Sequence, residues 1–425
     1  MTSTEPSPAS PELDALAAEI MARLDELAAI SETPGLLTRR YLTPEHRAAN
    51  DLVAAWMREA GMSVREDAVG NVIGRYEGAT AGAPALLIGS HLDSVVDAGR
   101  YDGMLGVVTG IACVKTLAAR GQRLPHAVEV VGFCDEEGTR FQSTYLGSRA
   151  VAGAFESALL ERSDAEGVTL AKAMTAFGLD PARVGESARR PEELVGYLEL
   201  HIEQGPVLED EGLPVGVVTA ISGQTRLVLM LEGIAGHAGT VPMGLRKDAL
   251  AGAAACVLAV EELCRAHPPV VGTVGRLTVA PDATNVIPGS VQFTLDLRAP
   301  DDAQRESVLA ALRERFETVA RERGLTLSIE TVHQAGSVAC AEPLRAHLAG
   351  AIERCGWPVR ELPSGAGHDA AAMAGITDVG MIFVRCDGGI SHNPAEAITT
   401  ADAAAGARVL LDAITSFPER REGEE

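Results

Sequence analysis

Residues 86–102, LLIGSHLDSVVDAGRYD, carry the clearest structural pattern in this chain of 425 residues. Four apolar or small residues come first, and the sequence then turns polar at His91 and Asp93. This pattern predicts a buried strand whose carboxyl end delivers polar side chains into a crevice, where open α/β sheets bind ligands. Asp102 stands before a glycine and a long apolar run, near the start of a predicted helix that faces the same crevice. An imidazole and a carboxylate that converge there could bind a divalent ion, although a capping aspartate and a structural histidine would give the same residues.

Composition and charge limit the classes of function. A chain of 425 residues suggests two domains, each with its own core. The net charge of -23 argues against nucleic acid and anionic membrane surfaces as partners, because both need clustered Lys and Arg. The seven cysteines form no CxxC pair, which is typical of reduced thiols in the cytoplasm. The opening residues MTSTEPSPAS show no signal-peptide pattern, and no apolar run reaches the roughly 18 residues of a membrane span. We therefore expect a cytoplasmic protein.

The order of predicted elements indicates an α/β fold. The strand that starts at Leu86 is followed by a predicted helix at 103–120 and by another strand in HAVEVVGFCDEEG, residues 126–138. This strand, helix, strand rhythm predicts a mostly parallel sheet covered by helices.

The pattern changes between about Ser222 and His333. Six predicted elements follow one another there in the order β, α, β, β, α, β, which is the order of a ferredoxin-like unit. About 110 residues are enough for a separate domain, and the α/β pattern resumes after them. We therefore expect a catalytic domain formed by residues 1–221 and 334–425, with a smaller α+β domain, residues 222–333, inserted into one of its loops.

Three further predicted strands also end on side chains that can bind metal. Residues 134–138 read CDEEG, His201 follows YLEL, and His392 follows VGMIFVRC. Neighbouring side chains on an extended chain point in opposite directions, so Glu136 and Glu137 would not both readily bind one ion. An acidic pair alone is more often a solvated turn. Repetition of this layout favours a site for two metals that share a bridging carboxylate, about 3.5 to 4 Å apart.

The motifs GSHLDSV, YDG, DEEGTRF, HIEQGP, GHAGT, TNVIPG, DLRA, SGAGHDA and SHNPAE occur in this order. The set resembles the dinuclear metal amidohydrolases of the M20 peptidase clan, and most closely the group of allantoate amidohydrolase, N-carbamoyl-L-amino acid amidohydrolase and β-ureidopropionase. The resemblance implies an inserted lid domain through which two subunits pair as a homodimer. It also implies two divalent ions per subunit, and mixed nitrogen and oxygen ligation suits Zn²⁺, Mn²⁺ or Co²⁺.

The resemblance also assigns the metal ligands, residue by residue. They are His91, Asp102 and His201 for one ion, and Glu137, Asp102 and His392 for the other, with Asp102 bridging. Glu136 would be the general base, because a carboxylate beside metal-held water can take its proton and pass it to the leaving amine. Asp93 would accept the free N–H of His91 and fix its tautomer, or else cap a turn. In this family the bond after the bridging aspartate is commonly cis, and here that bond joins Asp102 and Gly103.

Other residues acquire substrate roles from the resemblance. His237, in the inserted domain, would stabilise the tetrahedral oxyanion from the lid or from the partner subunit. Asn285 and Arg298 would hold the substrate carboxylate, which a planar guanidinium can bind bidentately. Without the resemblance, His237 is an ordinary loop histidine and Arg298 a surface arginine. The remaining predicted contacts are the amides of Gln204 and Gln224 and the glycine-rich loop with Gly365, Gly367 and His368.

The predicted reaction is hydrolysis of the C–N bond of a ureido group next to a carboxylate, with release of ammonia and CO₂. Thr139 and the SGAGHDA loop favour allantoate slightly over an N-carbamoyl-L-amino acid, because carbamoylases more often have a serine at the first of these positions. A peptidase of the same clan is an alternative, but peptidases usually have an acid in place of His201. A non-catalytic relative would be expected to lose Glu136 or a ligand. No GxGxxG or GxxxxGK motif follows a strand, which argues against a nucleotide site.

Overall fold

The computed structural model describes residues 11–418, so the opening segment on which the signal-peptide prediction rests lies outside the described part. The chain divides into two compact units. The large unit comprises Met1–Thr219, Cys340–Leu362 and Gly367–Glu425, and the small unit comprises Ala220–Ala339 with Pro363–Ala366. The segment 363–366 joins the small unit because the carbonyl of Ser364 accepts the Ser222 N–H at 2.9 Å and the carbonyl of Gly365 accepts Arg298 Nη1 at 2.8 Å.

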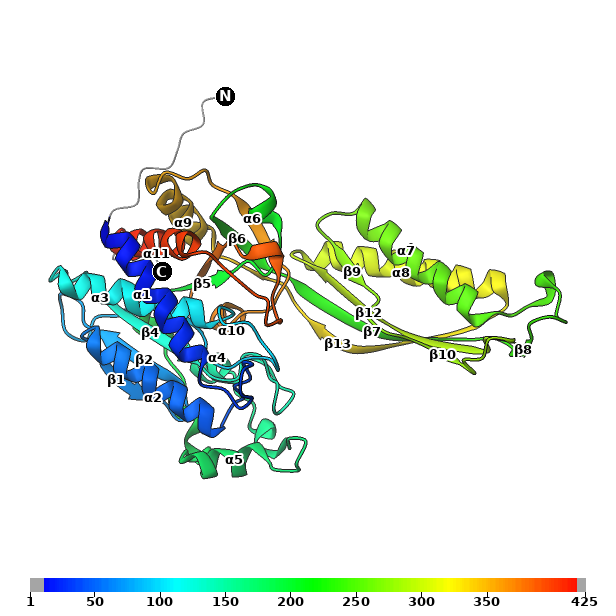
Figure 1. The fold of residues 1–425 in the computed structure, drawn as a ribbon, viewed down its shortest axis with the longest axis horizontal. Helices are drawn as coiled ribbons and strands as arrows, with labels where there is room; N and C mark the ends of the chain where they lie inside the picture. Colours follow the sequence, from blue (N-terminus) through cyan, green and yellow to red (C-terminus); the bar gives the residue numbers. More distant parts are fainter. Residues whose placement is uncertain (1–10, 419–425) are drawn as a thin grey trace. The chain divides into compact units, whose positions relative to one another are not determined.

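Within residues 11–418, nine strands form one sheet in the order β1-β2-β4-β3-β5-β16-β6-β14, with β15 also paired with β6 (Figure 1). The strands β4, β3, β5 and β16 run parallel to one another, whereas β1, β2, β6 and β14 pair antiparallel with their neighbours. The strands are β1 (Ser63–Glu66), β2 (Val72–Tyr76), β3 (Ala85–His91), β4 (Ala127–Phe133), β5 (Leu194–Ile202), β6 (Val215–Ile221), β14 (Val338–Ala339), β15 (Glu361–Ser364) and β16 (Val379–Val384). The predicted mostly parallel α/β sheet is confirmed.

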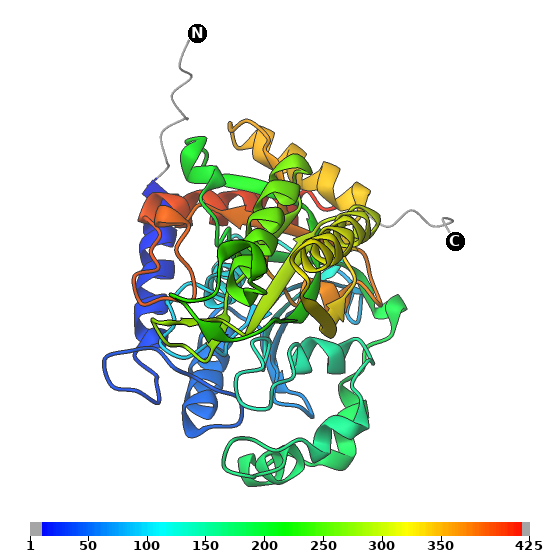
Figure 2. The ribbon, with the colours of Figure 1, turned by 90° about the vertical axis from the view of Figure 1, so that its right-hand side faces the viewer.

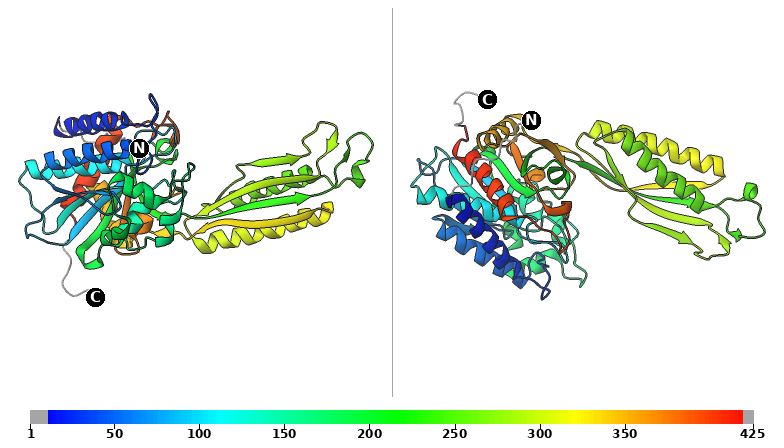
Figure 3. Two further views of the ribbon diagram at one scale, coloured as in Figure 1. Left: turned by 90° about the horizontal axis from the view of Figure 1, so that it is seen from below. Right: turned by 45° about the horizontal axis from the view of Figure 1, so that its top comes forward.

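Helices pack on both faces of this sheet (Figure 3). Alternate strand residues such as Leu198 and Leu200 share one apolar core with α1, α2, α3, α9 and α11. Glu199 points to the opposite face and accepts the Ala370 N–H at the start of α10 at 3.0 Å. The helices of the large unit are α1 (Pro11–Ala28), α2 (Pro44–Glu59), α3 (Met104–Ala119), α4 (Leu146–Val151), α5 (Leu170–Phe177), α6 (Val207–Asp210), α9 (Glu342–Arg354), α10 (Ala370–Met373) and α11 (Thr400–Thr415).

The helix α3, which begins directly after Asp102, lies unusually close to β5. A Cβ atom at Gly106 would lie 2.3 Å from the backbone oxygen of Leu200, so only glycine allows this approach. All seven residues of β3 are buried beneath this helix. The close packing fixes the start of α3, and with it Asp102, relative to the strand ends.

The small unit is an antiparallel sheet with two helices on one face. Its strand order is β10-β12-β7-β13, with β9 also paired with β12, and α7 and α8 lie side by side against it (Figure 2). Alternation along β7 directs Leu227, Leu229 and Leu231 to the helices and Gln224 and Arg226 to the other face. The elements are β7 (Gly223–Glu232), β8 (Gly236–His237), α7 (Ala249–Ala266), β9 (Val271–Thr273), β10 (Leu277–Ala280), β11 (Val286–Ile287), β12 (Ser290–Ala299), α8 (Asp302–Arg323) and β13 (Thr326–Ala335). This order is that of a ferredoxin-like unit.

The seven cysteines of the chain are free and buried. None of the helices within residues 11–418 combines the length and the apolar character needed to cross a membrane.

His46 makes the stability of the large unit sensitive to acid. It is 1% exposed on α2, its Nδ1 accepts the Leu42 N–H at 3.1 Å, and burial lowers its pKa to about 3. Because this pKa lies below the value of the unfolded chain, protons bind the unfolded state preferentially as the pH falls below about 6.5. We expect the wild type to lose about 2 kcal/mol of stability at pH 5 through this residue.

The variant His46→Gln should therefore lose less stability than the wild type between pH 7 and pH 5. Thermal unfolding of the metal-free protein at both pH values measures the difference. The variant His267→Gln, at an exposed histidine, provides the control for replacing a histidine by glutamine. Equal pH dependence in His46→Gln and wild type would contradict the prediction.

Candidate metal centre

The carboxyl ends of the parallel strands bring the predicted ligands together. β3 ends at His91 and β5 carries His201 near its end, while Glu137 follows β4 and His392 follows β16. Asp102 completes the cluster from the turn before α3. Within the described residues, the ligand atoms of His91, Asp102 and His201 form one group, and those of Asp102, Glu137 and His392 form another.

The two oxygens of Asp102 face different groups. Its Oδ1 lies 3.4 Å from Nε2 of His91 and 3.1 Å from Nε2 of His201. Its Oδ2 lies 3.3 Å from Nε2 of His392, and this nitrogen lies 3.5 Å from Oε1 of Glu137. A carboxylate that presents one oxygen to each of two ligand groups has the arrangement of a bridging ligand.

Hydrogen bonds fix the tautomers of the two buried histidines. Nδ1 of His91 lies 3.0 Å from the backbone oxygen of Asp93, and Nδ1 of His201 lies 2.9 Å from that of Ile202. A carbonyl only accepts, so each Nδ1 carries the proton and each Nε2 presents a lone pair. Nε2 of His201 is buried without a hydrogen-bond partner among the described residues. Imidazole nitrogens and carboxylate oxygens arranged in this way fit divalent metal ions.

Asp93 has a different partner from the one expected. The prediction that its carboxylate accepts the His91 N–H is wrong: Oδ1 lies 3.8 Å from Nδ1, and the backbone carbonyl of Asp93 takes the bond instead. The turn after β3 brings this carbonyl closer to the ring than the carboxylate. The Asp93 carboxylate accepts the N–H groups of Glu136 at 3.0 Å and Glu137 at 3.2 Å. It therefore orders the turn that carries the predicted base.

Glu136 lies beside the ligands, 7% exposed, and forms a group with His91 and Glu137. The chain is not extended here, because Asp135 has a φ of 55° that turns the backbone before the two glutamates. Burial raises the pKa of the Glu136 carboxyl well above its usual range, and the charge of Glu137 adds to this rise. A carboxyl whose pKa moves toward neutrality is suited to accept and return a proton.

The cis bond expected after Asp102 is absent. The cis bonds of residues 11–418 are Pro268–Pro269 and Ala280–Pro281, and the Asp102–Gly103 bond is trans. Gly103 has a φ of 78°, and a Cβ at this position would lie 2.5 Å from the His91 ring. The left-handed conformation of glycine therefore supplies the sharp turn that aims the carboxylate.

Residues without an assigned role hold Asp102 in place. The Ser391 hydroxyl donates to its Oδ2 at 2.9 Å, and Glu396 accepts its backbone N–H at 3.1 Å. Nε2 of Gln204, predicted to contact substrate, also donates to Oδ2, at 2.8 Å. The observed partner of Gln204 is thus the proposed metal ligand Asp102.

Glu199 lies two residues before His201 on β5. It accepts hydrogen bonds from the side chains of Ser90 and Tyr197, both at 3.0 Å. The SHNPAE motif was the signal for Ser391 and Glu396, whereas Glu199 looked like an ordinary strand residue.

The glycine-rich loop is split between the two units. His368 is buried in the large unit, where its ring lies 4.5 Å from that of His201 and burial lowers its pKa well below the usual range. A Cβ at Gly367 would lie 1.7 Å from the Tyr145 hydroxyl, so a larger residue here would have to displace the Tyr145 side chain. Gly365 belongs to the small unit.

Arg298 lies on β12, on the face of the small unit's sheet that α7 and α8 do not cover. It pairs with Gln224 on the neighbouring strand β7. Its Nε and Nη2 donate to the Asp296 carboxylate at 2.9 and 3.0 Å, and its Nη1 donates to the Gly365 carbonyl at 2.8 Å. Arg226 donates to the same carboxylate at 3.0 Å. Asp296 therefore fixes the plane of the Arg298 guanidinium.

His237 and Asn285 lie together at the other end of the small unit. The Ala238 N–H donates to the Asn285 carbonyl at 2.9 Å, and β8 pairs with β11 beyond the end of β7 (Figure 1). Eight residues separate Gln224, beside Arg298, from Glu232 at the end of β7, and at about 3.3 Å per residue this distance is about 26 Å. Within one chain, Arg298 and His237 are too far apart to contact one small substrate.

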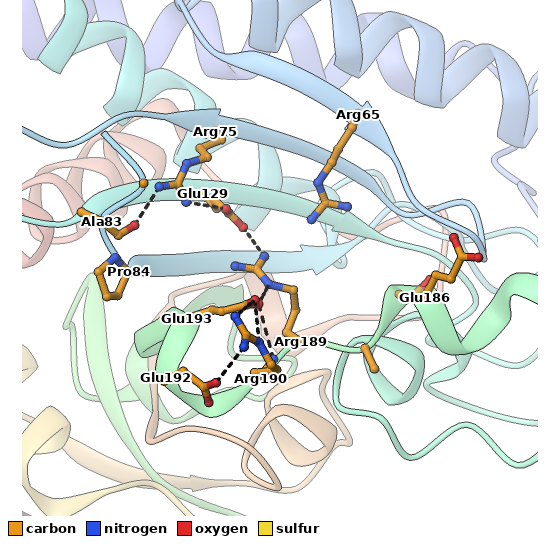
Figure 4. A pocket seen from close by; sticks show the side chains of 13 residues that line it. Arg65, Arg75, Ala83, Pro84, Glu129, Glu186, Arg189, Arg190, Glu192 and Glu193 are labelled. Carbon is orange, nitrogen blue, oxygen red and sulfur yellow. Dashed lines mark hydrogen bonds and ion pairs between the residues drawn. The ribbon is translucent and has the colours of Figure 1, made fainter. Parts of the chain in front are cut away.

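A separate cavity of about 580 Å³ in the large unit is lined by arginines and glutamates (Figure 4). Glu129, 3% exposed on β4, lies between Arg75 at 2.8 Å and Arg189 at 2.6 Å. Glu193 pairs with Arg189 at 2.7 Å. Arg75, Arg189 and Arg190 already have carboxylate partners, and none of the predicted site residues lines the cavity. The ion pairs along the cavity connect the segment before β5 to β2 and β4.

Comparison with known proteins places the chain in a family. Residues 87–416 match Peptidase family M20/M25/M40. N-carbamoyl-L-amino acid amidohydrolase of Geobacillus stearothermophilus is 47% identical over 393 residues, which are 92% of this chain and 96% of that one. Allantoate deiminase 1 of Glycine max is 43% identical over 427 residues, covering 92% and 88%. A crystal structure of an amidase of the hydantoinase/carbamoylase family from Burkholderia multivorans matches with a TM-score of 0.89 and 39% identity, covering 94% and 97%. The chain therefore belongs to peptidase family M20/M25/M40, and within it to the amidohydrolases that act on C–N bonds other than peptide bonds.

Proposed function

We propose that this protein hydrolyses the C–N bond of a ureido group on a small carboxylate, with allantoate as the substrate and two divalent ions, Zn²⁺, Mn²⁺ or Co²⁺, in each subunit. The observation that carries the proposal is the placement of the two Asp102 oxygens, each facing its own group of ligand atoms, beside the buried carboxyl of Glu136. The large unit is then the catalytic domain and the small unit the lid and dimerisation domain.

Glu136 is the proton carrier in this proposal. Divalent ions supply an activated water and polarise the ureido carbonyl when bound. The Glu136 carboxylate accepts a proton from the attacking water and returns it to the departing nitrogen, as one group can do when it contacts both. The Asp93 carboxylate, through the N–H of Glu136, keeps this side chain at the turn after β4.

His237 is suited to stabilise the negative oxygen that develops during the attack. Its Nδ1 accepts the Gly239 N–H at 3.0 Å, so its Nε2 carries the proton and can donate to an oxyanion. Because His237 lies beyond Glu232, which is about 26 Å along β7 from Gln224 beside Arg298, we propose that it serves the site of a second copy of the chain. Exposed apolar side chains near it, 78% for Met243 and 76% for Leu245, support a homodimer formed through the small unit.

Arg298 is the proposed partner of the substrate carboxylate, with Asn285 as a second polar contact. The variant Arg298→Lys should raise KM by about 10- to 100-fold, because a lysine replaces a planar bidentate donor with a point charge. Steady-state kinetics of ammonia release measure the change. Arg265→Lys is the control, since the exposed Arg265 pairs with Glu261 on helix α7 and should leave KM nearly unchanged. An unchanged KM in Arg298→Lys would remove this residue from substrate binding.

An N-carbamoyl-L-amino acid is the second candidate substrate. The relative that is 47% identical carries that activity in its name. In addition, the Thr139 hydroxyl donates to the Ser94 carbonyl at 3.3 Å, and a serine could make the same bond. Thr139 therefore does not discriminate between the substrates. A cavity of about 590 Å³ beside Arg298, lined by Val271 and Val332 among others, could accept an apolar side chain.

Ammonia release from allantoate, N-carbamoyl-β-alanine and a panel of N-carbamoyl-L-amino acids tests the proposal. We expect the highest kcat/KM for allantoate. A higher value for a carbamoyl amino acid would establish the second candidate, and a higher value for the β-alanine derivative would indicate a β-ureidopropionase. Absence of turnover on the whole panel with metal bound would contradict ureido hydrolysis.

A further inference from the structure

Arg39 is fully buried and contacts the turn of residues 92–94 that follows β3, here called the ligand turn because it comes directly after the proposed ligand His91. Its side chain is 0% exposed, and its Nε donates to the carbonyl of Leu92 at 2.7 Å. Leu92 lies between the proposed ligand His91 and Asp93. We propose that Arg39 is a positioning residue that holds both of them in the geometry required for metal binding. This inference rests on the metal centre of the proposed function.

The same guanidinium also binds the end of helix α1. Nη1 of Arg39 donates to the carbonyls of Leu27 and Ile30, both at 2.9 Å. The last carbonyls of a helix lack partners within the helix and need external donors. Arg39 supplies a donor to Leu27 in the last turn of α1 and to Ile30 just beyond the helix, while its Nε holds the Leu92 carbonyl. Its planar arrangement of N–H groups can serve carbonyls in fixed directions at once, which a lysine cannot do.

Backbone hydrogen bonds keep Arg39 and the ligand turn in register. The Arg39 N–H donates to the Ser94 hydroxyl at 3.0 Å, and the Ser94 N–H donates to the Arg39 carbonyl at 3.0 Å. Further along, the Ala98 N–H donates to the Leu37 carbonyl at 2.8 Å. The turn at 92–94 is thus held by the Arg39 side chain and by its backbone.

The turn that Arg39 holds also carries Asp93, whose carboxylate contacts the second half of the site. Burial lowers the pKa of Arg39 to about 10, with Asp93 opposing the shift, so the guanidinium is charged at neutral pH. The 1% exposed Asp93 carboxylate holds the N–H groups of Glu136 and Glu137. Arg39 therefore supports His91 through Leu92, and supports the N–H groups of the two glutamates through the turn that carries Asp93.

The variants Arg39→Lys and Arg39→Met test the proposal by metal affinity. Competition with a chelator should show an affinity about 10- to 100-fold below wild type, the size of effect expected for a residue that orients metal ligands. The visible absorption spectrum of the Co²⁺-loaded variants should also change, because the ligand geometry changes. A purely structural role would lower the thermal unfolding midpoint without altering either readout.

The matched control is Arg305→Lys. Arg305 is also buried, at 2% exposure, and donates to a carbonyl, that of Ala335, at 3.1 Å, but it lies in the small unit. This variant should lose stability and keep wild-type metal affinity. Arg39→Lys retains the charge and carries the test if Arg39→Met does not fold. Wild-type affinity and an unchanged Co²⁺ spectrum in a folded Arg39 variant would overturn the proposal. Because these readouts need no substrate, they stand apart from any failure of ureido turnover.

Discussion

Replacing Glu136 with glutamine should lower kcat by about 10³- to 10⁴-fold while the protein retains its metal. The amide has nearly the shape of the carboxylate, so the turn held by the Asp93 carboxylate should stay intact. It cannot accept a proton from water or return one to the leaving nitrogen. Steady-state ammonia release gives kcat, and elemental analysis of the purified variant gives the metal content.

Glu137, the neighbour of Glu136, provides the matched control for the Glu136→Gln variant. Glu137 has an oxygen 3.5 Å from Nε2 of His392 and belongs to a ligand group, so Glu137→Gln should lose metal together with turnover. Wild-type turnover in Glu136→Gln would remove this carboxylate from the mechanism. Loss of metal in Glu136→Gln would instead identify it as a ligand.

Combining two inactive subunits should restore activity. His237→Ala alone should lower kcat by about 10²- to 10³-fold through loss of the oxyanion donor. In a heterodimer of His237→Ala and Glu136→Gln, one site receives an intact Glu136 from one chain and an intact His237 from the other. The other site carries both substitutions. The purified heterodimer should therefore have about half of the wild-type activity per dimer, because one of the two sites of a symmetric pair is complete.

Subunits with different affinity tags allow this heterodimer to be isolated from co-expression. Homodimers of each variant serve as controls and should both be nearly inactive. If each chain used its own His237, every site of the heterodimer would carry one substitution, and no recovery would occur. This result would contradict the completion of the site by a second copy.

The proposed ligands His91, Glu137, His201 and His392 could be found because each lies at or just beyond the end of a buried strand, whereas the family resemblance assigned Asp102 as their bridge. The apolar run before His91 marks β3, and a parallel sheet brings such strand ends together at one edge. The small unit was predictable for a similar reason, because its strands alternate in polarity and its helices do not. Periodicity reports which residues face the core, and the carboxyl ends of the strands then give the position of the site.

Local turns and distant polar contacts could not be predicted in this way. The φ of 55° at Asp135 places Glu136 and Glu137 differently from an extended chain. The Asp102 N–H donates to Glu396, which is 294 residues away in the sequence. Arg39 was overlooked because arginine is rarely buried, and nothing nearby in the sequence indicates its partners. Such contacts depend on tertiary packing, on which polarity patterns carry no information.

The position of β16 in the middle of the sheet has a consequence for biosynthesis. β16 pairs with β5 on one side and with β6 on the other, yet it is synthesised long after both of them, at residues 379–384. A nascent chain therefore exposes the unpaired edges of β5 and β6 until this segment leaves the ribosome, and such edges invite aggregation. His392 emerges later still. The proposed ligand group of Asp102, Glu137 and His392 can therefore assemble only after His392 has been synthesised.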